Sequence, residues 1–191
     1  VDAAEDGDEG GPDQYSTDFQ GLYMTIEQPD GRLLDEHDLP DGNFYKMEGG
    51  TGTLNNQGPT QPTDRSDLNA FMNAYKSYPA VDWWEANFDL ENYYNFRAIA
   101  MAIHDYDMHA GKNYFYYNNP ETDRWAVYNW DIDLTWTTTY NGGGGDGPLN
   151  QYVLDRHPRF QMDYANRVRE IADLLGRPVD RLEPLALGDD D

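Results

Sequence analysis

Two aromatic runs in the second half of the chain restrict the fold more than any other feature. They are NYFYY at residues 113–117 and WAVYNW at residues 125–130, and turn-forming residues such as Asn119 and Pro120 separate them. Aromatic and β-branched residues favour strands, whereas Asn, Asp and Pro favour the turn between them. The pattern predicts a β-hairpin. Because a hairpin brings the start of its first strand close to the end of its second, Asn113 and Asp131 are expected to be neighbours.

Apolar residues at helical spacing predict three helices around this hairpin. The first begins at Ser66 as N-cap and continues through Tyr75, and the last covers residues 160–175 before Gly176. Between them, a helix capped by Asp89 extends to about residue 103 with a continuous apolar stripe, which is typical of a core helix.

Short strands are expected in the first third of the chain. Alternating apolar residues predict one strand at residues 22–26, closed by a turn at 29–31, and a second at 43–47. The stretch 49–64 is rich in Gly, Thr, Asn, Gln and Pro, and is expected to be a surface loop. We therefore expect an α+β domain at residues 19–178, with acidic tails at 1–18 and 179–191.

The charge of the chain excludes several classes of function. Thirty-six acidic residues and only 13 Lys and Arg give a formal net charge of -23, which would repel nucleic acid and anionic membranes. A halophilic source is consistent with this charge. Without cysteine the chain cannot form a disulfide framework or a thiolate zinc site. No apolar run approaches the roughly 20 residues of a membrane span, and the first residues show no signal-peptide pattern, so no membrane insertion is expected.

Polar residues at one end of the hairpin form a candidate site. Asp107 is expected on a loop that follows the core helix, beside Asn113 and Asp131, with Asp133 as a further ligand. Hard oxygen ligands of this kind suit Mg²⁺ or Mn²⁺, with phosphate supplying further ligands, and protein kinases use a similar Asp, Asn and Asp trio. Asp105, on the last turn of the core helix, is expected to be a surface residue.

The same residues resemble a known family. The segments HDYDMHAGKNYFYY and YNWDID are similar to the N-x-D, NYYLY and WDxD segments of the spore-coat CotH kinase-like family. Two further blocks are similar to that family, GLYMTIEQPDGRLLDEH followed by DGNFYK, and LDRHPRFQMDYANRVREI. All blocks stand in the family order, and the resemblance covers about residues 19–175.

The resemblance implies a protein kinase-like fold, mostly the helical C-terminal lobe, with a catalytic β-hairpin and a short N-terminal strand pair. The first lobe is expected to be incomplete, because the strand-rich portion of the family has no counterpart before residue 19. The implied activity is ATP- and Mg- (or Mn-) dependent phosphorylation of Ser or Thr in a protein partner, at an extracellular or cell-surface location.

The resemblance also assigns roles to individual residues. Asp107 would be the catalytic aspartate, and Asn113 and Asp131 would hold the metal. Glu27 and Lys46 match polar positions of the first block and would bind the cofactor, through an ion pair with each other or through contact with phosphate.

Three other interpretations stay open at this stage. The first is a catalytically weak or inactive kinase-fold domain that serves in coat, matrix or cell-surface assembly. The second is a Ca²⁺-dependent binding module, for which the acidity is the only argument. The third is a transition-metal cluster made by four neighbouring side chains, namely His104, Asp105, Asp107 and His109.

Overall fold

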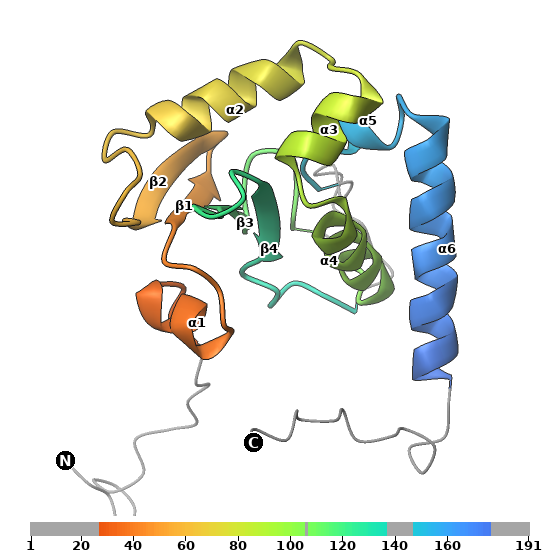
Figure 1. Ribbon diagram of the computed structural model, residues 1–191. Coiled ribbons are helices and arrows are strands. Elements are labelled where there is room, and N and C mark those ends of the chain that lie inside the picture. The colour runs from red at the N-terminus through yellow and green to blue at the C-terminus, as the bar shows by residue number, and fades with distance from the viewer. Residues whose placement is uncertain (1–26, 106, 137–146, 177–191) are drawn as a thin grey trace, which may run out of the picture.

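A four-stranded antiparallel sheet forms the centre of the domain in the computed structural model, which describes residues 27–105, 107–136 and 147–176 (Figure 1). The strand order is β2 (Thr51–Asn56), β1 (Asn43–Glu48), β3 (Tyr114–Asn118) and β4 (Trp125–Asn129). The predicted aromatic hairpin is confirmed as β3 and β4, in which Tyr116 pairs with Val127. The strand predicted at residues 43–47 is confirmed as β1.

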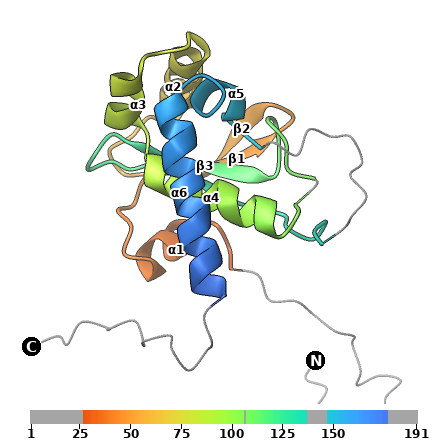
Figure 2. The same ribbon diagram turned by 90° about the vertical axis from the view of Figure 1, so that its right-hand side faces the viewer.

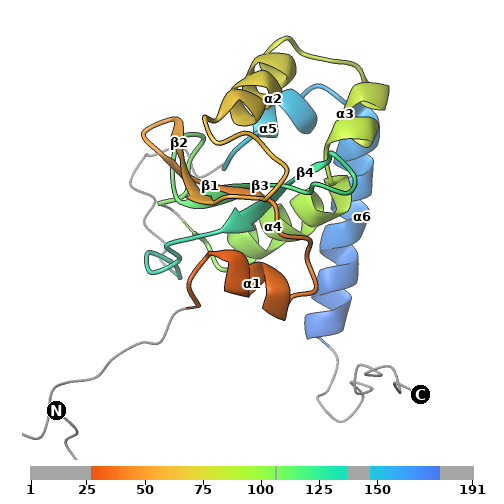
Figure 3. The same cartoon turned by 60° about the vertical axis from the view of Figure 1, so that its left-hand side comes forward.

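Both faces of the sheet are covered, which explains why the central strands β1 and β3 bury aromatic side chains on both faces. On one face, Tyr45, Tyr116 and Val127 join the main core with residues of the helices α2 (Ser66–Lys76), α3 (Val81–Asn87) and α4 (Leu90–Ala102). On the other face, Phe44 and Phe115 stack with ring centroids 4.7 Å apart and pack beside Leu34 of the short helix α1 (Gly31–Glu36). Figure 3 shows α1 on one side of the sheet and α2 and α3 on the other.

The predicted core helix is confirmed as α4, and the last predicted helix as α6 (Pro158–Leu175). The carboxylate of Asp89 caps α4 by accepting a hydrogen bond from the amide of Asn92 at 3.0 Å. Helix α6 follows the one-turn helix α5 (Asn150–Val153) and lies beside α4, where Arg167 donates to the side chain of Asn95 at 2.6 Å (Figure 2). Within the described residues, no helix has the length and apolar content needed to cross a bilayer.

Some expectations about local structure need correction, and others fall outside the described residues. The stretch 49–64 contains β2, an edge strand whose outer residues are exposed and whose sequence TGTLNN therefore carries one large apolar residue. The turn at 29–31 leads directly into α1, which Asp30 caps. Ser66 is the first residue of α2 rather than its N-cap, which is Arg65 in the left-handed region. The strand expected at 22–26 and the two tails lie outside the described residues.

A buried polar network fastens the sheet to the start of α2. The carboxylate of Asp67 accepts hydrogen bonds from the hydroxyl of Tyr45 at 2.5 Å and from the side-chain amides of Asn43 at 3.0 Å and Asn118 at 3.3 Å. Asn43 is fully buried, and its Oδ1 also accepts a hydrogen bond from the backbone amide of Gly58 at 2.9 Å. One carboxylate thus accepts hydrogen bonds from three donors on two strands, and for the hydroxyl of Tyr45 and the side-chain amide of Asn118 it is the acceptor that the structure gives.

We predict that Asp67→Ala lowers the free energy of unfolding by about 2–3 kcal/mol, because it removes the acceptor of the buried Tyr45 hydroxyl and of the Asn118 amide. Asp82→Ala, at an exposed position in the first turn of α3, serves as the control and should cost less than about 1 kcal/mol. Urea denaturation followed by tryptophan fluorescence measures both. Equal losses for the two variants would contradict the role of the network.

Candidate functional site

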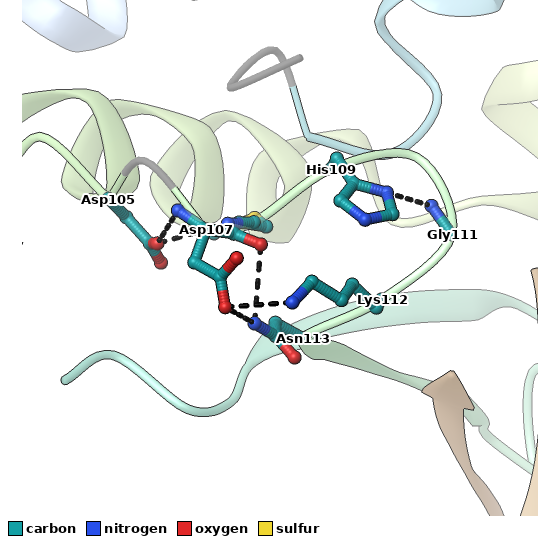
Figure 4. A network of polar contacts seen from close by, with 7 residues as sticks. Asp105, Asp107, His109, Gly111, Lys112 and Asn113 are labelled. Carbon is teal, nitrogen blue, oxygen red and sulfur yellow. Dashed lines mark hydrogen bonds and ion pairs between the residues drawn. The ribbon is translucent and has the colours of Figure 1, made fainter. Parts of the chain in front are cut away.

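The loop after α4 carries the candidate site and begins with a buried carboxylate. Helix α4 ends at Ala102, and His104 turns the chain through a left-handed conformation with φ of 52°. The next residue, Asp105, is only 4% exposed, which corrects the expectation of a surface residue. Its Oδ1 accepts hydrogen bonds from the backbone amides of Asp107 at 3.3 Å and Met108 at 3.2 Å (Figure 4). The turn at His104 folds the Asp105 side chain beneath the loop instead of toward solvent.

Contacts along its whole length hold this loop in place. Met108 is 2% exposed and belongs to the main core. The amide of Lys112 donates to the carbonyl of His109 at 3.2 Å, and this closes a tight turn. The carbonyl of Gly111 accepts a hydrogen bond from the backbone amide of Gly50 at 2.8 Å. The hydroxyl of Tyr114 donates to the carbonyl of Ala110, also at 2.8 Å. The loop is therefore tied both to the β1–β2 turn and to the hairpin.

Asp107 lies at the centre of a set of side-chain contacts. Its Oδ2 accepts hydrogen bonds from the ammonium of Lys112 at 2.8 Å and from Nδ2 of Asn113 at 2.9 Å, and Nδ2 also reaches the carbonyl of Asp107 at 3.2 Å (Figure 4). The hydrogen bond from Lys112 is the main reason that the pKa of Asp107 lies below its ordinary value. The Asp107 side chain is 29% exposed, so its ionised carboxylate is accessible from solvent.

Asn113 and Asp131 lie at the same end of the hairpin, where Asn113 is opposite Trp130, the residue before Asp131. The β3–β4 register pairs Tyr114 with Asn129, and the amide of Trp130 donates to the carbonyl of Asn113 at 3.3 Å. Asn113 and Asp131 both adopt left-handed backbone conformations, with φ of 67° and 56°, which Asn and Asp tolerate better than most residues. Asn113 is 2% exposed, whereas Asp131 is exposed. The charge of Asp131 helps to raise the pKa values of both Asp105 and Lys112.

Side-chain oxygen atoms at this end of the hairpin are of the kind that binds a divalent cation. Nδ2 of Asn113 donates to Asp107, so the side-chain oxygen Oδ1 is the atom of Asn113 that suits a cation, and Asp131 at the same end of the hairpin is exposed. Asp133 is exposed two residues further on. Among the described residues, no three acidic or histidine side chains come together as a preformed metal site.

The same geometry does not support the transition-metal interpretation. Nδ1 of His109 accepts a hydrogen bond from the amide of Gly111 at 3.1 Å, and Oδ1 of Asp105 is occupied by two backbone amides. His104 is exposed on the turn itself. The four side chains do not gather into a metal-holding group in this part of the chain.

Glu27 and Lys46, the residues implied to bind the cofactor, have separate partners. The carboxylate of Glu27 lies 3.2 Å from Nε2 of His37. The ammonium of Lys46 lies over the ring of Trp130, 5.2 Å from its centroid. No ion pair joins Glu27 to Lys46 in the structure as described. Lys46 is nevertheless close to the candidate site, because Trp130 directly precedes Asp131.

Sequence reasoning missed two residues of the site, Asp105 and Lys112. Lys112 could have been found, because it is the only Lys or Arg in the acidic loop and stands next to Asn113. The burial of Asp105 could not have been predicted from the sequence, because it depends on the left-handed turn at His104.

The family model described as "CotH kinase protein" matches residues 13–174, which is most of the chain. The matched segment includes α4, the loop that carries Asp107, and the complete hairpin. No curated protein matches the chain.

We predict that Lys112→Met raises the pKa of Asp107 toward the ordinary aspartate value, because the variant removes the main group that lowers it. In the wild type, the stability from this ion pair is present above the unfolded-state pKa of Asp107 and is lost as the pH falls through the lower folded-state pKa. Carboxyl ¹³C NMR titration measures the change. Lys76→Met on α2 is the control, and an unchanged Asp107 midpoint in Lys112→Met would show that the pair does not form in solution.

Proposed function

The chain belongs to the CotH kinase family, and on this premise we propose that it is an ATP- and Mg-dependent kinase-like domain that phosphorylates Ser or Thr of a protein partner. One observation carries the proposal. Asp107 and Asn113 are joined side chain to side chain at 2.9 Å in a loop that is tied to the β1–β2 turn and to the hairpin, and Asp131 follows Trp130 at the same end of the hairpin. Phosphoryl transfer depends mainly on positioning and electrostatic stabilisation, and this arrangement offers both.

Asp107 is the proposed catalytic residue. Its Oδ2 is engaged by Lys112 and Asn113, so Oδ1 is the atom that accepts a hydrogen bond from the acceptor hydroxyl and aligns it with the γ-phosphorus. Because Lys112 lowers the pKa of Asp107, the carboxylate stays ionised and acts mainly by orienting the hydroxyl. As the new O–P bond forms and the bond to the leaving ADP breaks, the hydroxyl proton passes to Asp107 or to the transferred phosphate.

Asn113 and Asp131 are the proposed ligands of Mg²⁺ or Mn²⁺, with Asp133 as a further ligand. Bound there, the metal would neutralise charge on the β- and γ-phosphates. The side chain of Asn113 donates to Asp107, and its backbone leads directly into the paired strand β3. The side-chain oxygen Oδ1 of Asn113 is therefore fixed before ligands arrive. The left-handed backbone at Asp131 turns the chain sharply at the end of β4, where the carboxylate is accessible to solvent.

Lys46 is proposed to approach the nucleotide phosphates from β1, since its ammonium lies over Trp130 beside Asp131. We also assign Glu27, whose observed partner is His37, to the cofactor region. The protein partner and the extracellular or cell-surface location stay predictions from the family resemblance.

We predict that Asp131→Asn and Asp107→Ala each reduce metal-dependent phosphotransfer by at least about 100-fold without unfolding the domain. Asp107→Ala should still be stabilised by MgATP in a thermal-shift assay, because Asp107 acts on the acceptor and not on the nucleotide. Transfer of ³²P from ATP to a Ser- and Thr-containing protein mixture measures activity. Asp123→Asn, in the exposed turn of the hairpin, is the matched control.

Unchanged transfer in Asp131→Asn would contradict the proposed metal site. If MgATP at millimolar concentration does not stabilise even the wild type, the inactive assembly domain becomes the better interpretation, because a ligand that binds the native state must stabilise it.

A further inference from the structure

Asp105 is a buried carboxyl group that the proposed chemistry does not use. It is 4% exposed, and it lies between the end of α4 and the loop that carries Asp107. Oδ1 accepts two backbone hydrogen bonds, whereas Oδ2 is buried without a hydrogen-bond partner in the structure. A buried polar oxygen left in this state is costly, and such costs are concentrated at functional sites.

The two hydrogen bonds of Oδ1 act directly on the catalytic loop. One goes to the amide of Asp107 itself and the other to the amide of Met108, whose side chain is buried in the main core. A carboxyl group that accepts the amides two and three residues ahead fixes the direction in which the chain leaves the helix. Figure 4 shows the Asp105 side chain beneath the backbone of Asp107, on the side away from Lys112.

We propose that Asp105 is a positioning residue, which holds the backbone of Asp107 so that the Asp107 carboxylate meets Lys112 and Asn113. This inference rests on the proposed function, in which Asp107 orients the acceptor hydroxyl. The backbone of Asp107 is held by Asp105, and its side chain by Lys112 and Asn113 at 2.8 and 2.9 Å. With both ends fixed, Oδ1 of Asp107 has one direction in which to face a substrate.

The hydrogen bonds require an acceptor at Oδ1, and they do not require a negative charge. Burial raises the pKa of the Asp105 carboxyl, and the charges of Asp107 and Asp131 add to this effect, so that the neutral acid is favoured more than in an exposed aspartate. An asparagine has the same shape and the same acceptor atom. Asp105→Asn is therefore expected to preserve the loop, whereas Asp105→Ala removes the acceptor.

The test compares these two variants by steady-state kinetics. Asp105→Ala should lower kcat by about 10- to 100-fold, because a small displacement of a catalytic group has effects of this size, while the KM for MgATP stays near the wild-type value. Asp105→Asn should keep kcat close to that of the wild type. Asp89→Ala is the matched control, because it removes an aspartate cap from the other end of the same helix and should lower the melting temperature without lowering kcat.

Amide hydrogen exchange followed by NMR gives a second readout that does not need activity. In the wild type, the amides of Asp107 and Met108 should be protected, in Asp105→Asn they should stay protected, and in Asp105→Ala they should exchange faster, with Gly111 unchanged because it donates to His109. If Asp105→Ala fails to fold, Asp105→Leu replaces it, since Leu has a similar size and no acceptor.

Three results would overturn the inference. They are rapid exchange of both amides in the wild type, an unchanged kcat in Asp105→Ala, and an equal loss of kcat in Asp105→Asn and Asp105→Ala. If the wild-type protein transfers no phosphate, the proposed function fails, while the exchange measurement still decides whether Asp105 holds the loop.

Discussion

The β3–β4 pairing is the constraint on which the rest of the structure depends. Strand β3 is buried on both faces, and its aromatic side chains contribute to the main core on one side and to the α1 side on the other. A shift of one residue would exchange the two faces, so the register is strongly specified. The same register determines that Asn113 lies beside Trp130 and that Asp131 follows at the strand end. Core packing therefore places two of the proposed ligands.

The loop between α4 and β3 brings Asp107 to the same end of the hairpin. It is fixed by Asp105 near its start, by Met108 in the core and by Gly50 near its end. Few of its internal degrees of freedom remain, so the contact between Asp107 and Asn113 forms at little additional entropic cost. Lys112 offsets negative charge at a point where three aspartates from the loop and the hairpin lie near one another. In this chain with a net charge of -23, the pair with Lys112 holds the pKa of Asp107 below its ordinary value.

Features that depend on local composition could be predicted from the sequence. The hairpin follows from aromatic strands and a turn rich in Asn and Pro, and α4 follows from its Asp89 cap and apolar stripe. Features that depend on tertiary contacts could not. Strand β2 exists because β1 offers an edge with which it can pair, although TGTLNN has little intrinsic strand character. The burial of Asp105 likewise requires a left-handed backbone conformation at His104, and a histidine in the sequence does not by itself predict that conformation.

The central claim is that Asp107, Asn113 and Asp131 form a single site for a metal-bound nucleotide. Paramagnetic broadening by Mn²⁺ in the presence of a non-hydrolysable ATP analogue tests this most directly, because broadening falls steeply with distance from the metal. We expect the backbone amide signals of Asn113 and Asp131 to broaden first, followed by that of Asp107, at sub-stoichiometric Mn²⁺. Broadening spread evenly over the acidic surface, with no preference for these residues, would contradict the claim.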